Sequence, residues 1–227
     1  MGISARAGSH LLSGLPEPIS TELFEKARVV QLAADKVLFL EGDPGDGCYR
    51  VEEGLLKVSF ISSTGGERIL AILGRGAVVG ELAILDELPR SASVTAIRDS
   101  QLRFVSRQQF SLVAKSHPEI YRHITSLLAA RLRDTNMAVA AASFLPLKGR
   151  VARALIDLAD AFGENVGGKR ILIRQKISQS DVAAMAGIAR ENVSRILNEW
   201  IREKLLSRVS GYYCLENKAA LDKAAKL

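Results

Sequence analysis

The chain has 227 residues, 48% of them hydrophobic and 25% charged, an ordinary composition for a globular protein. No apolar run approaches the roughly 20 residues of a membrane-spanning helix, and residues 1–12 show no signal-peptide pattern. The cysteines, Cys48 and Cys214, lie too far apart for a metal-ligand pattern, so we expect a protein of the reducing cytoplasm with no membrane partner.

Positive charge is concentrated in the last third of the chain. Residues 1–146 carry 16 Lys and Arg and 16 Asp and Glu, whereas residues 147–227 carry 15 against 9. The whole net charge of +6 therefore lies in the second part. A neutral part joined to a compact basic part indicates two domains, the second of which binds a polyanion.

The first half of the chain is expected to be mainly β-structure after one short helix over residues 19–30. In residues 37–81, β-prone runs alternate with the turn sequences EGDPGDG, EEG, STGGE and GRGA. A spacing of about 8–12 residues between turns is typical of a β-barrel or jelly roll. Residues 91–106 predict two further strands around a turn at Asp99 and Ser100.

A helical period replaces the strand pattern from residue 107 onwards. Residues 107–116 predict a short helix, and residues 117–145 predict a long one with Pro118 near its first turn. Because usual helices have about 11–12 residues, we favour pairing of the long helix with a second chain over simple covering of the β-domain. Its apolar stripe comprises Ile120, Ile124, Leu127 or Leu128, Leu132, Val139 and Phe144.

The last third of the chain begins at an interruption of this pattern. Pro146 and Gly149 predict a hinge there. A helix ending at Gly163 follows, and then a short strand within residues 170–178. The last expected element is a hairpin that turns at residues 210–211.

Residues 178–200 have the pattern of a helix-turn-helix. Ser178 is a good N-cap with Asp181 three residues later, and Gly187 permits a sharp turn. The second helix of such a motif lies in the major groove of DNA. It is expected over residues 190–200, with Val193, Ile196, Leu197 and Trp200 facing inward.

The outward side chains of this second helix are suited to reading bases. Arg190 and Arg195 can each bind guanine through two hydrogen bonds, and Glu191 can accept one from cytosine. The alternative is an ordinary solvated helix face. The small residues of the first helix, the turn glycine and the basic charge together favour DNA.

A second constellation lies in the sequence GELAILDELPRSA, residues 80–92. Glu81 offers a carboxylate, Arg90 a guanidinium and Ser91 a small hydroxyl, which are the groups needed to hold an anionic sugar phosphate. One arginine neutralises the single charge of a cyclic phosphodiester. The alternative is a surface salt bridge that flanks a short helix.

Four segments resemble, in order and spacing, the CRP/FNR superfamily of bacterial transcription regulators: GELAILDELPRSASVTA, RLRDTNMAV, FLPLKGRVARALIDLA and SDVAAMAGIARENVSRIL. The resemblance covers roughly residues 24–214. It implies an α+β protein with three parts. These are a β-roll or jelly-roll cyclic-nucleotide-binding domain over residues 1–116, a long dimerisation helix over 117–145 and a winged helix-turn-helix over 146–227.

The resemblance also implies roles for the residues of the first site. Glu81 accepts from the ribose 2′-hydroxyl, Arg90 pairs with the cyclic phosphate and Ser91 donates to it. On the long helix, Thr135 faces the purine and Asn136 reaches the nucleotide of the partner subunit. Both residues can serve cyclic AMP or cyclic GMP, and the family habit favours cyclic AMP. The ligand-binding set is completed by Gly80, Leu82, Ala92 and, near the ribose, Arg131.

For the basic domain, the resemblance implies a homodimer that binds an inverted-repeat operator with half-sites like TGTGA and acts through RNA polymerase. Arg190, Glu191 and Arg195 match the family's base-reading positions. Pro146 stands where Asp is common at the hinge. Ligand binding is expected to realign the long helices and let the basic domains reorient. Residues 148, 178 and 179 are the phosphate-contact candidates, namely Lys148, Ser178 and Gln179.

Other readings have weaker support. An iron–sulfur cluster needs about four cysteines, and the chain has two. Haem would need histidine, and of His10, His117 and His123 the last two are not on one helix face at ligand spacing. A cyclic-nucleotide module that acts on a protein partner is disfavoured by the basic helix-turn-helix. Catalysis is disfavoured because no nucleophile–base pair is evident, so we expect no metal and no enzymatic activity.

Overall fold

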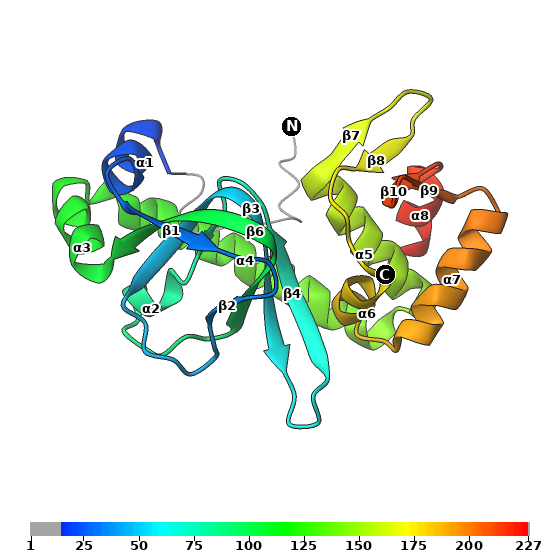
Figure 1. Cartoon of the computed structure of the whole chain (residues 1–227), viewed down its shortest axis with the longest axis horizontal. Coiled ribbons are helices and arrows are strands. Elements are labelled where there is room, and N and C mark those ends of the chain that lie inside the picture. The colour runs from blue at the N-terminus through cyan, green and yellow to red at the C-terminus, as the bar shows by residue number, and fades with distance from the viewer. Residues whose placement is uncertain (1–14, 227) are drawn as a thin grey trace. The chain divides into compact units, whose positions relative to one another are not determined.

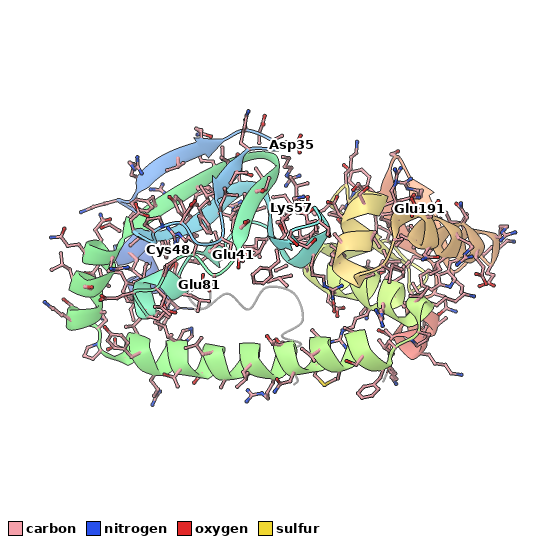
Figure 2. The ribbon with its side chains drawn as sticks, turned by 90° about the horizontal axis from the view of Figure 1, so that it is seen from below. Asp35, Glu41, Cys48, Lys57, Glu81 and Glu191 are labelled. Atoms are coloured by element: carbon pink, nitrogen blue, oxygen red, sulfur yellow. The ribbon has the colours of Figure 1, made fainter. Side chains whose placement is uncertain are left out.

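The computed structural model describes residues 15–226, apart from the side chains of Leu127, Ala130 and Arg131. The chain divides into two compact units between Arg133 and Asp134 (Figure 1). This boundary falls inside α4 (Glu119–Phe144), the long helix along the lower edge of Figure 2. No helix of the described part of the chain is long and apolar enough to cross a membrane.

The N-terminal unit is built around an antiparallel sheet of six strands (Figure 1). The strand order is β1-β6-β3-β4, with β2 beside β6 and β5 beside β3. This arrangement confirms the expected β-domain. The strands are β1 (Arg28–Leu32), β2 (Val37–Phe39), β3 (Gly47–Ile61), β4 (Glu67–Leu73), β5 (Val78–Val79) and β6 (Ser93–Ser106).

The helix expected over residues 19–30 is wrong in its second half. Helix α1 covers only Glu17–Phe24, with Pro16 immediately before it. The following residues form β1, which pairs with β6 from Arg28 opposite Phe104 to Leu32 opposite Ser100. Long-range pairing with β6 overrides the local helical preference, because sheet contacts outweigh the small differences in helix propensity.

The turn expected at Asp99 and Ser100 is also absent, since β6 runs through these residues as one strand. The irregularity lies in the neighbouring strand, where the register with β6 shifts between Val51 and Leu56. Gly54 has φ of +106°, and the Ser100 hydroxyl accepts from Leu55 N at 3.1 Å. The Ser100 hydroxyl therefore accommodates a bulge in β3, whereas Asp99 accepts from Ala34 N at 2.8 Å.

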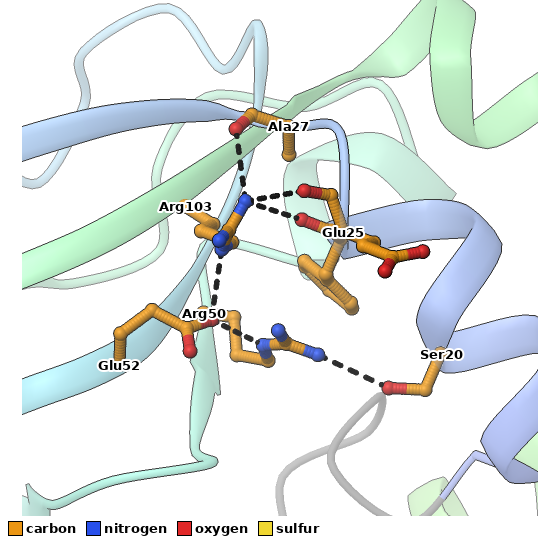
Figure 3. Close-up of polar contacts among 7 residues, drawn as sticks. Ser20, Glu25, Ala27, Arg50, Glu52 and Arg103 are labelled. Atoms are coloured by element: carbon orange, nitrogen blue, oxygen red, sulfur yellow. Dashed lines mark hydrogen bonds and ion pairs between the residues drawn. The ribbon is translucent and has the colours of Figure 1, made fainter.

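An arginine network ties α1 to the sheet (Figure 3). On β6, Arg103 donates through Nη1 to the carbonyl oxygens of Phe24, at 3.2 Å, and Glu25, at 2.5 Å. On β3, Arg50 donates to Glu52 at 2.6 Å and to the Ser20 hydroxyl at 3.2 Å. The end of α1 is thereby fixed against β3 and β6.

Two apolar clusters make up the core of this unit. One lies between the helices and the sheet and includes Phe24, Phe110 and Ile120, all at most 3% exposed. The other lies inside the roll and includes Leu56 and Leu102, both fully buried. Helix α3 (Arg107–Ser116) is where the sequence predicts it, and a capping box of its N-cap Ser106 with Gln109 defines its start.

The C-terminal unit consists of helices packed around a four-stranded sheet, in the order β7-β8-β10-β9. The expected helices, the strand and the final hairpin are confirmed, whereas β7 and α8 were not predicted. The elements are α5 (Leu147–Phe162), β7 (Gly163–Asn165), β8 (Ile171–Ile173), α6 (Gln179–Ala186), α7 (Arg190–Arg202), β9 (Leu206–Val209), β10 (Tyr212–Leu215) and α8 (Lys218–Ala224).

The hinge expected at Pro146 and Gly149 is shorter than the sequence indicates. Only Leu145 and Pro146 separate α4 from α5, and Pro146 occupies the N-cap of α5. Gly149 lies buried within α5, where a β-carbon would be 2.8 Å from the carbonyl oxygen of Ala224. This glycine is therefore required for close packing of α8 and is no part of a flexible joint.

Candidate functional site

The first candidate site is formed where β5 turns into the short helix α2 (Leu82–Leu85). The turn residue Gly80 has φ of +83°, a conformation in which only glycine is free of strain. Glu81 follows as the N-cap residue of α2. The chain then returns through Arg90 to the start of β6, so the two ends of the GELAILDELPRSA segment lie together.

Arg90 is almost completely buried, at 4% exposed. Its Nη1 donates to the carbonyl oxygens of Gly47, at 2.6 Å, and Gly80, at 2.8 Å. Its guanidinium carbon lies 4.3 Å from the centre of the Phe39 ring. Nε is buried and has no hydrogen-bond partner among the described residues. A fixed buried cation with an unused donor is suited to binding an anion.

Glu81 is buried to the same degree, at 4% exposed. Figure 2 shows it close to Cys48, and its carboxylate is the second cause, after complete burial, that raises the pKa of the Cys48 thiol far above its usual range. The Arg90 charge acts in the opposite direction. Cys48 therefore remains a neutral thiol, and the burial of both charged residues excludes the surface salt bridge considered above.

Glu81 and Arg90 line a cavity of about 150 Å³. Gly80, Glu81, Leu82, Arg90, Ser91 and Ala92 all lie on its wall, so the structure brings together the predicted residues of this segment. Phe39 from β2 also lines the cavity. The Asp46 carboxylate accepts a hydrogen bond from Arg90 Nη2 at 3.1 Å. Sequence reasoning missed both, because they lie more than 40 residues before Arg90 and carry no local signal.

The predicted residues of α4 are placed less completely. Thr135 and Asn136 are exposed on α4 within the C-terminal unit. The Arg131 side chain lies outside the described residues. Their roles in ligand binding stay predictions.

The second candidate site is the helix-turn-helix of α6 and α7. Ser178 caps α6 by accepting from Asp181 N at 3.0 Å, in a reciprocal capping box. Gly187 ends α6 in the left-handed conformation with φ of +64°. As predicted, the face of α7 that packs on the unit is buried, and it consists of Val193, Ile196, Leu197 and Trp200.

The opposite face of α7 forms an open concave surface with the start of α6. Figure 2 labels Glu191 on this helix. Arg202 lies seven residues after Arg195, on the same face, and sequence reasoning missed it although this helical spacing signals it. The surface is lined by Gln179, Arg190, Glu191, Ser194, Arg195, Asn198 and Arg202.

Two of the three phosphate-contact candidates, Lys148 and Ser178, have existing partners. Lys148 is exposed but forms an ion pair with Glu199 of α7 at 2.5 Å. This hydrogen bond holds the pKa of Glu199 below its usual value. The Ser178 hydroxyl donates to the Asp181 carboxylate at 2.6 Å. Gln179 alone of the three lines the concave surface.

The described histidines and acidic residues were also considered as metal ligands. No three His, Cys, Asp or Glu side chains among them could share a metal ion. His117 bridges Glu22, at 2.9 Å, and Glu119, at 3.2 Å, in a structural role at the start of α4.

Comparisons with known proteins match both parts of the chain. A cyclic nucleotide-binding domain matches residues 29–117, and a Crp-like helix-turn-helix domain matches residues 149–224. The CRP-like cAMP-activated global transcriptional regulator of Mycobacterium tuberculosis is 31% identical over 96% of this chain and 93% of its own length. The cyclic AMP receptor protein of Thermus thermophilus is 32% identical over 96% and 97%.

Among solved structures, FixK2 from Bradyrhizobium japonicum has the same fold, with a TM-score of 0.79 at 21% identity over 88% of this chain and 98% of its own. The order of the two matched domains agrees with the two units of the structure. The chain therefore belongs to the CRP/FNR family of transcription regulators, with a cyclic-nucleotide-binding domain and a helix-turn-helix DNA-binding domain.

Proposed function

We propose that this protein is a homodimeric transcription regulator whose DNA binding is controlled by a cyclic nucleotide at Arg90. The observation that carries the proposal is the buried Arg90 guanidinium, whose Nε has no partner among the described residues. In the proposed organisation, residues 1–116 bind the nucleotide, residues 117–145 form the dimerisation helix and residues 146–227 bind DNA.

The cavity fits a cyclic nucleotide in its chemistry. Nε and Nη2 form one edge of the planar guanidinium, which matches two oxygens of a phosphate, and one arginine balances the single charge of a cyclic phosphodiester. Gly80 lets Nη1 approach the backbone closely, because a β-carbon there would lie 2.4 Å from this nitrogen. Glu81 is the acceptor proposed for the ribose hydroxyl, and Ser91 the additional phosphate donor.

Cyclic AMP is the nucleotide we propose, with cyclic GMP as the competitor. Two relatives that are 31% and 32% identical over 96% of this chain are described as cAMP-activated and as a cyclic AMP receptor. Thr135 and Asn136 are the proposed purine contacts, and their hydroxyl and amide can bond with either base. The choice therefore depends on measurement.

Dimerisation is proposed for α4 because this helix carries large apolar side chains in contact with solvent. Leu132 and Val139 are each 62% exposed, and Phe144 is 80% exposed. Helix pairing in a second copy would cover these side chains and stabilise the dimer. Two copies of α7 would then face successive major grooves, about 34 Å apart, on an inverted-repeat operator.

For DNA recognition, we propose Arg190, Glu191 and Arg195 as the base-reading residues and RNA polymerase as the target of the bound dimer. All three side chains are exposed on the concave surface. The nucleotide acts as a switch only through a difference in its affinity for DNA-competent and DNA-incompetent conformations.

Calorimetry with cyclic AMP and cyclic GMP, combined with DNA mobility shifts, tests this function. Wild-type protein should bind at least one nucleotide and bind its operator more tightly in its presence. Arg90→Ala should abolish both effects, whereas Arg98→Ala, which removes an exposed arginine from β6, should preserve them. Nucleotide-stimulated DNA binding by Arg90→Ala would overturn the proposal.

A further inference from the structure

The Arg90 guanidinium already has an anionic partner within the chain. Nη1 donates to two carbonyl oxygens, those of Gly47 and Gly80, and Nη2 donates to Oδ1 of Asp46 at 3.1 Å. Since Nη1 is saturated, a phosphate has to bind through the edge formed by Nε and Nη2. Asp46 therefore holds one of the two nitrogens that the phosphate needs.

The backbone around Asp46 is firmly attached to the nucleotide-binding segment. The carbonyl oxygen of Asp46 accepts from Arg107 N at 2.9 Å. Arg107 Nη2 donates to the carbonyl oxygens of Gly45, at 2.8 Å, and Ala83, at 2.9 Å, which joins this loop to α2. A β-carbon at Gly45 would lie 2.1 Å from that of Ala83, so the loop and the helix are in close contact.

The two partners differ in their exposure to water. The Arg90 side chain is 2% exposed, whereas the Asp46 side chain is 73% exposed. The Asp46 carboxylate can therefore be rehydrated by a change of rotamer while its backbone stays in place. Arg90 has no such freedom, because two carbonyl oxygens hold it from within.

We propose that Asp46 is an internal counterion that competes with the phosphate of the ligand for Arg90 and thereby sets the affinity of the site. This inference rests on the proposed function of Arg90. Two anions at one nitrogen repel each other, so ligand binding must displace the Asp46 carboxylate or tolerate its charge. Asp46 thus raises the nucleotide concentration at which the protein responds.

The test compares Asp46→Asn with Glu87→Gln by calorimetry. Glu87 is a matched control because its side chain is 74% exposed and it lies 4.0 Å from Arg107 rather than contacting Arg90. Asp46→Asn should bind cyclic AMP about two- to fivefold more tightly, the range expected for losing one exposed ion pair. The affinity of Asp46→Asn for cyclic GMP should rise by the same factor, because both nucleotides have the same cyclic phosphate. Glu87→Gln should match wild type.

Salt and a charge-conserving variant sharpen the comparison. The gain of Asp46→Asn should shrink at higher ionic strength, since salt screens the exposed carboxylate of the wild type. Asp46→Glu should keep an affinity near that of wild type. Weaker or unchanged binding by Asp46→Asn, with an unaltered melting temperature, would show that Asp46 orients Arg90 or plays no part, and either result overturns the inference.

The failure of this inference is distinguishable from failure of the proposed function. If wild-type protein binds neither cyclic nucleotide, both are overturned. If wild type binds and Arg90→Ala does not, the proposed function stands, and the comparison of Asp46→Asn with wild type alone decides the role of Asp46.

Discussion

Gly80 and Arg90 are packed so closely that a β-carbon at residue 80 would lie 2.4 Å from Nη1 of Arg90. At the same time, the carbonyl oxygen of Gly80 accepts from that nitrogen at 2.8 Å. The turn thus fixes the guanidinium through its backbone and leaves no room for a side chain. Any substitution at Gly80 must move the Arg90 guanidinium, which is the group proposed to bind the phosphate.

We predict that Gly80→Ala lowers nucleotide affinity by at least about tenfold, because a shift of the guanidinium breaks its charge-assisted hydrogen bonds. Gly76→Ala is the matched control, since Gly76 also has φ of +83° but has no atom within 4 Å of its β-carbon position. Both variants should lose about 1–2 kcal/mol of stability from the left-handed conformation, and Gly80→Ala should lose more because its β-carbon meets Arg90. Equal nucleotide binding by the two would contradict the packing argument.

Leu132→Glu should convert the protein from dimer to monomer in analytical ultracentrifugation, because a charge is then placed in the proposed α4 interface. Leu112→Glu on α3 is the control, since Leu112 is 59% exposed and Leu132 62%. If both variants sediment as wild type does, pairing does not use this face of α4.

Glu191→Ala is expected to change which operator bases are preferred, because Glu191 is the proposed acceptor for cytosine in the major groove. A loss of about 1–3 kcal/mol of discrimination at one base pair is the expected size, measured by mobility shifts on single-substituted operators. Glu203→Ala, just beyond the end of α7, should leave the preference unaltered. An unaltered preference in Glu191→Ala would mean that α7 reads DNA differently.

Glu199→Gln tests whether Lys148 contacts DNA phosphates. The substitution removes the carboxylate that now pairs with Lys148, so the freed ammonium can bind a phosphate. Affinity should rise for all DNA sequences alike, and the slope of log affinity against log salt should steepen by about one unit. In the double variant Glu199→Gln/Lys148→Ala, this gain in DNA affinity should vanish. If the gain persists, it results from the change in net charge and not from Lys148.

The His117 bridge predicts a pH dependence of stability. Hydrogen bonds to Glu22 and then Glu119 raise the pKa of His117 above its ordinary value. The contribution of the charged His117 to the free energy of unfolding is therefore complete below the unfolded-state pKa of about 6.5. It is lost as pH rises through the higher folded-state pKa. His117→Gln should lower the urea midpoint clearly at about pH 5.5 and little at about pH 8.5. An equal loss at both values would contradict a charged bridge.

Local signals in the sequence predicted the parts of this protein that local contacts build. The Ser178 cap, the Gly187 turn and the buried face of α7 follow helical periodicity, and they are where the sequence places them. The helix expected over residues 19–30 failed because β1 pairs with β6, some 70 residues further along the chain. The turn expected at Asp99 and Ser100 was wrong because β6 is continuous there, and the irregularity is a bulge near Gly54 on the neighbouring strand β3.

By itself, the sequence determined the family, the two-domain order and the short segment that carries Glu81 and Arg90, because these residues are close along the chain and their spacing is characteristic. Only the tertiary structure decided that both charges are buried and that Arg90 is held by Gly47 and faces Phe39 and Asp46. The physical reason is that the electrostatic field and the packing around a buried charge depend on strands that long-range pairing brings together. A local sequence pattern does not contain this information.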